Sequence, residues 1–418
     1  QRSLVGSEMC IRDRLNIIGD LIMKKILSVI TACIISSAGF AGCVEKNKET
    51  AEKEKVYSSP QFEKYFSNTF ISTSNNKKIS NADNVTYRAY IPLEEYGEFE
   101  YCFYFSNTVD STWGDGRSIY AGLQGGEYEI TSASVGDGGS GFEDEPVNMV
   151  SVTFNEAAGK TVSPGETFWS DPVNVNIPDG NFLVWEWTLT GENIPCINMS
   201  DLTPCYADGV YTNEIPLPAM FGCNREVKKT IAALGDSITQ GCQTTSHSYK
   251  FWAADIALDL GSDYSLWNLG LGYSRASDIA QKGDWLNRAK NADIVLVTYG
   301  TNDIVSGKNI DSGPSSAEQI EEWVRTTVKE LKDAGCEVIL FNAPPFDYDP
   351  ASEEIRTAFN EKAPLIADEY GAELFDFASY LSDPSNPSAA KYGGHPNDEG
   401  CKIVADAFLE KYANLIEN

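Results

Sequence analysis

One serine and one histidine stand in sequence contexts that suit acyl-transfer chemistry. Ser237 follows the apolar run 230–234 (TIAAL), which predicts a short buried strand, and a predicted helix follows from residue 248. In open α/β sheets, functional sites lie at the carboxyl ends of the strands, where Ser237 would stand. Gly235 permits a tight turn that a Cβ would disfavour. This pattern predicts an exposed nucleophile, although it also fits an ordinary turn.

A serine hydroxyl is a weak nucleophile until a neighbouring imidazole takes its proton. The chain contains only two histidines, His247 and His395. His247 lies in the polar stretch TTSHS soon after Ser237, and we expect it to be exposed. His395, within the sequence GGHPN near the end of the chain, is therefore the candidate base.

Four stretches at predicted strand ends resemble the sequence blocks of the SGNH, or GDSL, hydrolase family. They are Gly235–Ser237 (GDS), Asn268–Gly272 (NLGLG), Gly300–Asp303 (GTND) and His395–Asn397 (HPN). Each block alone is a weak signal, whereas four in the family's order are specific.

The resemblance implies a role for each block. Ser237 would be the nucleophile and His395 the base. The backbone N–H of Ser237, the backbone N–H of Gly272 and the side-chain amide of Asn302 would stabilise the oxyanion. The family glycine often falls one place later, where this chain has Tyr273, so either N–H can fill that role. The implied mechanism uses no metal and no cofactor.

One family feature is missing. The family usually has an aspartate three residues before the histidine, and this chain has Tyr392 there. Asp383 and Asp398 are close in sequence, but neither has the required spacing. Either another group orients His395, giving a Ser-His dyad, or the enzyme is weakened. Because aspartate is the smallest contributor in triads measured singly, its loss need not abolish activity. The absence of a Gly-x-Ser-x-Gly elbow argues against the α/β-hydrolase fold.

Strands and helices alternate across residues 225–418, which predicts an α/β domain. The family resemblance implies that this is an SGNH hydrolase domain. The expected fold is a three-layer α/β/α, flavodoxin-like arrangement with a parallel sheet of about five strands. Ser315 and Glu318 suggest a capping box before one helix, and Gly335 its end. The predicted strands are 230–234, 265–268, 294–299, 337–342 and 373–375, and the predicted helices are 248–260, 279–291, 316–334, 352–370 and one after residue 396.

Residues 58–224 are rich in short β-prone runs separated by turn residues, which predicts an all-β sandwich domain. In the run 182–189, one face carries Leu183, Trp185, Trp187 and Leu189, and we place this face in the core. Parts of the region resemble the β-sandwich that precedes the catalytic domain in some esterases of the same family. The other predicted strands are 99–105, 149–154 and 173–177.

The first residues indicate export. Residues 1–22 include a stretch that resembles a translated sequencing-adapter scar, and we exclude them from the fold. Residues 23–42 have the charged start and apolar run of a signal peptide, ending in a lipobox-like FAGC. The resemblance implies a lipid on Cys43, followed by a flexible tether over 43–57. We therefore expect a protein anchored to the outer face of a bacterial membrane, or secreted.

Charge and cysteine content limit the partners. Asp and Glu number 61 against 32 Lys and Arg, a formal net charge of −29. Such an acidic surface repels phosphate backbones, which argues against nucleic acid as a partner. We expect at most a few disulfides, with Cys196 and Cys205 the closest pair, and no structural zinc, since no Cys-x-x-Cys occurs.

The sequence thus predicts an exported serine esterase. Its most favoured substrate is an acetylated polysaccharide or oligosaccharide, an assignment by analogy with secreted family members that carry a β-sandwich. Two alternatives remain: a lipase or acyl esterase acting on lipid or small acyl esters, and a carbohydrate-binding protein whose SGNH domain is weakened.

Overall fold

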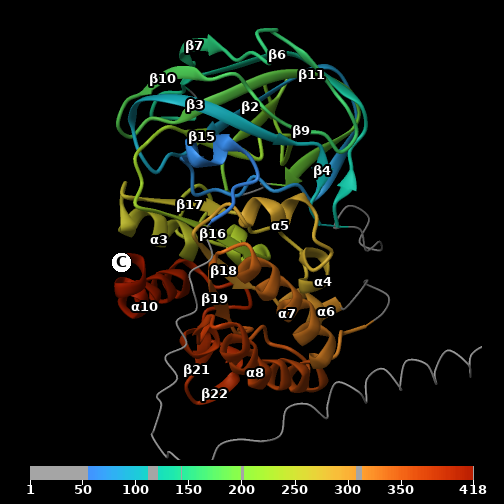
Figure 1. Cartoon of the computed structure of the whole chain (residues 1–418), viewed down its shortest axis with the longest axis vertical. Coiled ribbons are helices and arrows are strands. Elements are labelled where there is room, and N and C mark those ends of the chain that lie inside the picture. Colours follow the sequence, from blue (N-terminus) through green and yellow to red (C-terminus); the bar gives the residue numbers. More distant parts are fainter. Residues whose placement is uncertain (1–54, 112–120, 143, 199–201, 307–312, 418) are drawn as a thin grey trace, which may run out of the picture. The chain divides into compact units, whose positions relative to one another are not determined.

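The computed structural model describes residues 55–111, 121–142, 144–198, 202–306 and 313–417 (Figure 1). The predicted leader, the predicted lipidation site Cys43 and most of the predicted tether lie outside these residues. Within the described ranges, no helix combines the length and apolar character needed to cross a membrane.

The C-terminal part is organised around a five-stranded parallel sheet, as predicted. Four of its strands, β16 to β19, are buried along almost their whole length, which explains their continuous apolar runs. Figure 1 shows the neighbouring strands β17, β16, β18 and β19. The full order is β17 (Tyr264–Asn268), β16 (Lys229–Gly235), β18 (Ile294–Thr298), β19 (Glu337–Phe341) and β20 (Glu373–Phe375). The chain winds in opposite directions from β16, so its carboxyl end is a topological switch point, where such sheets bind ligands.

Helices connect these strands. The first, α2, begins at Ser237. The long helices α7 and α8 pack against each other, as do α3 and α10. The bounds are α2 (Ser237–Gln240), α3 (Trp252–Leu260), α4 (Ala276–Ile279), α5 (Asp284–Ala289), α6 (Thr301–Ser306), α7 (Ala317–Asp333), α8 (Pro350–Tyr370), α9 (Phe377–Leu381) and α10 (Asp398–Glu417). A hairpin of β21 (Ser382–Asp383) and β22 (Asn386–Ala390) precedes α10. The three-layer arrangement stays a prediction.

The structure corrects three helix predictions. The helix expected from 248 begins four residues later, because Tyr249 has a left-handed backbone (φ 57°). The helix expected over 279–291 is wrong: α4 and α5 are separate, and Lys282 between them has φ 61°. The capping box of α7 is formed by Ser316 and Gln319. It is one residue later than predicted, since the helix itself begins at 317.

The N-terminal part is an all-β region with two main antiparallel sheets. One sheet contains β1 (Phe66–Ser67), β15 (Met220–Cys223), β3 (Gly97–Ser106), β10 (Val173–Ile177) and β9 (Thr167–Trp169). The other contains β13 (Val210–Tyr211), β12 (Cys205–Ala207), β2 (Lys77–Ile91), β11 (Leu183–Asn198), β6 (Tyr128–Asp137), β7 (Val147–Ser151), β14 (Glu214–Ile215) and β8 (Lys160–Val162). A short pair, β4 (Thr108–Val109) with β5 (Leu123–Gln124), and the 3₁₀ helix η2 (Pro60–Glu63) complete it.

Aromatic side chains join the two sheets. The rings of Trp185 on β11 and Phe103 on β3 lie 4.7 Å apart between centroids. The four residues that the sequence placed on the core face of 182–189 are all buried. Val184 on the opposite face is also buried, and β11 continues to Asn198, well beyond the predicted run. Cys196 and Cys205 are buried and form no disulfide.

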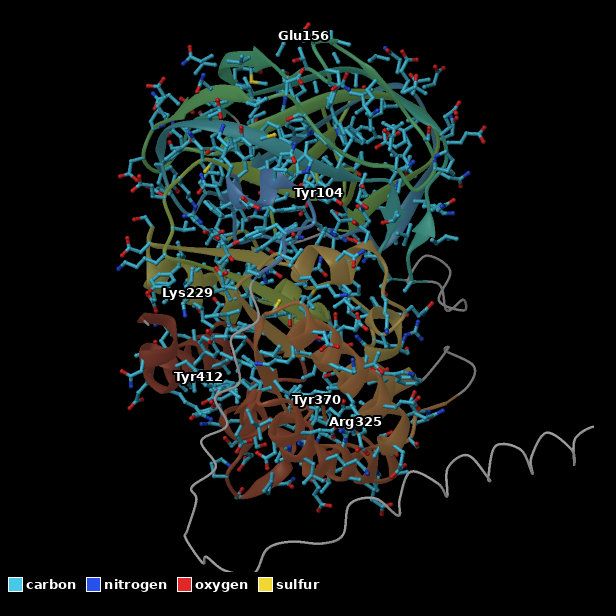
Figure 2. All side chains as sticks on the ribbon, viewed as in Figure 1. Tyr104, Glu156, Lys229, Arg325, Tyr370 and Tyr412 are labelled. Atoms are coloured by element: carbon cyan, nitrogen blue, oxygen red, sulfur yellow. The ribbon has the colours of Figure 1, made fainter. Side chains whose placement is uncertain are left out.

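Buried polar contacts connect the all-β region to the α/β region. Tyr104 on β3, labelled in Figure 2, donates from its hydroxyl to Oδ1 of Asp284 on α5 at 2.9 Å. On the same helix, Arg288 forms a fully buried ion pair with Asp110. Removing one partner of such a pair leaves an uncompensated buried charge, which is strongly destabilising. The two regions are therefore held together by specific polar contacts.

Candidate active site

Ser237 lies at the switch point of the parallel sheet. It is the first residue of the one-turn helix α2, directly after β16. The preceding Asp236 caps this helix, because its Oδ1 accepts a hydrogen bond from the N–H of Ile238 at 2.9 Å. Burial raises the pKa of Asp236 to about 7. Gly241 ends the turn with φ 103°, a conformation that favours glycine.

His395 lies 158 residues after Ser237 in the sequence, and the fold brings its imidazole to the serine. Its Nε2 lies 2.8 Å from Oγ of Ser237, within hydrogen-bond distance. The loop before α10 carries this histidine, and the ring of Phe346 packs edge-on against the imidazole, with centroids 5.2 Å apart. Burial lowers the pKa of His395 below its ordinary value of 6.5, since the charged imidazolium is less well solvated there. The ring is therefore neutral, and able to accept a proton, at neutral pH.

The carboxylates near His395 in sequence are engaged elsewhere. Asp398 accepts a hydrogen bond from the N–H of Thr245 at 2.7 Å. Asp383 accepts hydrogen bonds from the N–H and hydroxyl of Ser385. Among the described residues, the only hydrogen bond of the His395 ring is that to Ser237.

Tyr392 occupies the position of the missing aspartate, and it is buried. Its side chain packs beside Gly400, where an added Cβ would lie 2.7 Å from Cβ of Tyr392. The position is thus used for packing against the start of α10.

The predicted oxyanion residues Gly272 and Asn302 follow β17 and β18, the two strands that pair with β16. A Cβ added to Gly272 would lie 4.0 Å from Cβ of Ser237, so the two residues are neighbours. The N–H of Gly272 donates to Oε1 of Gln240 at 2.7 Å. The side-chain amide of Asn302 donates to the carbonyl of Ser274 at 2.9 Å.

The alternative donor, Tyr273, directly follows Gly272. It has a left-handed backbone (φ 65°), and 53% of its surface is exposed. A tyrosine in this conformation is unusual and indicates a turn held firmly by its surroundings.

Two polar residues that sequence reasoning left without a role support this arrangement. Gln240, three residues after Ser237, is buried and accepts from Gly272. Asp303 is also fully buried and accepts from the N–H of Ala276 at 2.8 Å, and burial raises its pKa to about 7. Asp303 is the last residue of the block Gly300–Asp303, and Gln240 lies three residues after Ser237. Their polar character close to Ser237 and Asn302 in the sequence was the available signal.

His247, the second histidine, is half-buried, whereas the sequence predicted exposure. Its ring packs edge-on against Phe142 of the all-β region, with centroids 5.2 Å apart. Its backbone is left-handed (φ 56°). His247 therefore contacts the all-β region, whereas His395 contacts the nucleophile Ser237.

Comparison with known proteins agrees with this chemistry. Residues 233–403 match the GDSL-like Lipase/Acylhydrolase family. The matched stretch begins within β16 and contains Ser237, Gly272, Asn302 and His395. It supports the predicted class, a hydrolase that acts on ester bonds. No curated protein gives a significant match.

Several solved structures are similar to part of this chain. Axe2, an acetylxylan esterase from Geobacillus stearothermophilus, is 20% identical, with 44% of this chain and 94% of that chain covered at a TM-score of 0.37. The psychrotrophic esterase EstA from Pseudoalteromonas sp. is 19% identical, with 46% and 100% covered at 0.35. A member of the lipolytic protein G-D-S-L family from Veillonella parvula DSM 2008 is also 19% identical, with 44% and 98% covered at 0.35.

Proposed function

We propose that this chain is a serine esterase that works through a Ser237 acyl-enzyme with His395 as base. The observation that carries the proposal is the 2.8 Å separation between Oγ of Ser237 and Nε2 of His395 at the carboxyl end of β16. A nucleophile and a base within hydrogen-bond reach are what this chemistry requires.

The reaction proceeds in two halves. Oγ of Ser237 attacks the ester carbonyl while Nε2 of His395 takes the hydroxyl proton. The same proton passes to the leaving alkoxide, and an acyl-serine ester forms as the alcohol departs. Water then attacks this ester, His395 takes the water proton and returns it to Oγ, and the carboxylic acid leaves. Atoms and charge balance without any other reactant.

Each half passes through an oxyanion that needs preorganised donors. The amide of Asn302 and a backbone N–H at Gly272 or Tyr273 serve this role together with the N–H of Ser237. The N–H of Gly272 is bound by Gln240 in this structure, so its use requires the Gln240 side chain to release it. If Tyr273 is the donor, Gln240 instead fixes the preceding residue.

We assign acetylated polysaccharide or oligosaccharide as the substrate, and we take the all-β region as a β-sandwich preceding a three-layer hydrolase domain. The exported character predicted from the leader supports this assignment, since such esters occur outside the cell. The lipid on Cys43 would anchor the enzyme to the membrane's outer face. In a bacterial host, wild-type protein should then fractionate with membranes, and Cys43→Ser should not. Equal fractionation of the two, with no lipid label on the wild type, would contradict the anchor.

The test of the mechanism is hydrolysis of p-nitrophenyl acetate by the purified wild type and by Ser237→Ala. The variant should fold normally and lose turnover by a factor on the order of a thousand or more. Equal turnover in both preparations would exclude the serine mechanism. Comparing acetate with long-chain esters, and measuring acetate release from acetylated xylan, then separates the carbohydrate assignment from the lipid alternative.

A further inference from the structure

We propose that the all-β region is a positioning element of the esterase site, because it holds the chain segment that carries one of the oxyanion donors, the backbone N–H of Gly272 or Tyr273. This segment, Gly270–Asp278, follows β17 and includes Gly272 and Tyr273. Two residues of the all-β region form hydrogen bonds with this segment directly. A third forms one with Gln240, whose side chain binds the segment. The proposal rests on the function proposed above and adds a role for a region outside the matched family residues.

The first contact lies at the start of the segment. The hydroxyl of Ser72 donates to the carbonyl oxygen of Gly270, and Ser72 is fully buried. There is little space around Gly270, where an added Cβ would lie 2.5 Å from the backbone nitrogen of Gln240. The peptide at Gly270 is therefore pressed between α2 and the all-β region.

The second contact passes through Gln240. Its Oε1 accepts from the N–H of Gly272 at 2.7 Å, and its Nε2 donates to the carbonyl of Asn198 at 3.1 Å. Asn198 is the last residue of β11, and its N–H donates to Oδ1 of Asn76 at 3.1 Å. Both Gln240 and Asn76 are almost fully buried, so water does not compete for these bonds. One buried side chain thus joins Gly272, the neighbour of the nucleophile, to the end of β11, an inner strand of the larger β-sheet.

The third contact lies at the end of the segment. The hydroxyl of Ser111 donates to Oδ2 of Asp278 at 2.8 Å. The same carboxylate oxygen accepts from the N–H of Arg275 at 3.0 Å and so closes the capping box of α4. Ser111 and Asp278 are both buried, and Asp303 holds the adjacent N–H of Ala276.

These contacts matter for catalysis because an oxyanion donor acts only at the correct place. A misplacement of about 1 Å can lower the rate about a hundredfold. The family-matched residues 233–403 include the segment and Gln240, whereas Ser72, Ser111 and Asn198 lie outside them. The matched residues alone therefore do not contain all the groups that position the donor at Gly272 or Tyr273.

The experiment compares three variants with a control of the same kind. Ser72→Ala and Ser111→Ala each remove one hydrogen bond to the segment, and Gln240→Met removes two hydrogen bonds of Gln240, to Gly272 and to Asn198. Ser265→Ala removes a buried hydrogen bond, 2.8 Å to the carbonyl of Ser67, that also joins the two regions but lies on β17. Ser265→Ala therefore measures the effect of weakening the contact between the two regions without a change at the Gly270–Asp278 segment.

Each segment variant should lower kcat by about tenfold to a hundredfold while KM changes less than about threefold. Ser265→Ala should lose about as much thermal stability as the segment variants. Its kcat should stay within about twofold of the wild-type value, since the substitution leaves the segment in place. Restoring the hydroxyl with Ser72→Thr should recover part of the lost rate. Equal kcat losses in the control and the segment variants, or unchanged kcat in all of them, would overturn the proposal.

Hydrogen exchange separates this proposal from the proposed function. In Gln240→Met, backbone amides of the Gly270–Asp278 segment should exchange faster than in the wild type, while those of β17 should not. This readout needs no turnover. If exchange rises but Ser237→Ala has wild-type turnover, the proposed function fails and the positioning of the segment stands. If exchange is unchanged, the positioning role fails whatever the activity.

Discussion

Substituting Gly235 by alanine tests how the nucleophile is held. Gly235 is the last residue of β16 and pairs with Thr298 of the neighbouring strand. A Cβ at this position would lie 1.9 Å from Oγ1 of Thr298 and 2.1 Å from Oγ1 of Thr239. The two hydroxyls are hydrogen-bonded to each other and buried, so neither can turn away without losing its partner.

The expected cost follows from these contacts. Forcing one carbon into a packed site costs about 1–3 kcal/mol, and losing the hydrogen bond between the threonines costs about 1 kcal/mol more. We therefore expect Gly235→Ala to lower the free energy of unfolding by about 2–4 kcal/mol, a fall in Tm of roughly 5–10 °C. The carbonyl of Gly235 also accepts from the N–H of Leu271 and from the hydroxyl of Ser274, each at 3.0 Å. A shift at Gly235 therefore also moves the Gly270–Asp278 segment, which carries an oxyanion donor. We expect kcat/KM to fall by about a hundredfold.

Thermal unfolding and ester hydrolysis together measure these effects. Gly283→Ala is the matched control, because its Cβ would meet nothing nearer than Cα of Gly122, at an ordinary 3.7 Å. Adding Thr298→Ala to Gly235→Ala removes the nearer contact and should restore part of both Tm and kcat/KM. If Gly235→Ala has the Tm and kcat/KM of the wild type, the steric reasoning is wrong.

Three further predictions concern the catalytic groups. Because burial lowers the pKa of His395, the base stays deprotonated as the pH falls below 6.5, so the acid limb of kcat/KM should have its midpoint below that value; a midpoint above 6.5 would point to a carboxylate partner. Asp383→Ala and Asp398→Ala should each lower kcat/KM by less than about tenfold, while His395→Ala should be nearly as damaging as Ser237→Ala. A loss of about a thousandfold in either aspartate variant, with folding shown by circular dichroism, would reveal a triad aspartate. Asn302→Ala should lower kcat by about a hundredfold to a thousandfold with a smaller change in KM, and a rise in KM alone would make Asn302 a substrate contact.

The sequence alone determined the α/β character of the C-terminal part and the positions of its strands. Apolar runs such as 294–299 are continuous because a parallel strand is buried on both faces, and this signal is local. The bounds of β10 and β20 also agree with the prediction, and β10 alternates buried and exposed residues, which is likewise a local pattern. Helix starts were less accurate, because a left-handed residue such as Tyr249 follows from tertiary contacts and has no strong local signal.

The sequence explained only in part why position 235 is a glycine. The sequence suggested that glycine permits a special turn, whereas the structure gives Gly235 no left-handed backbone. What requires glycine is the lack of space beside Thr298 and Thr239. These contacts arise between residues distant in sequence, so no local pattern reports them.

The short distance between the side chains of Ser237 and His395 was also decided by the tertiary structure. The sequence selected both residues by type and context, since only two histidines exist. Whether His395 or His247 reaches the serine depends on how the loop before α10 folds back onto the end of β16. The contact between Gln240 and Asn198 likewise joins two regions that the sequence treats as separate. Its hydrogen bonds exist only because the folded chain buries both groups together, where unpaired polar atoms would be costly.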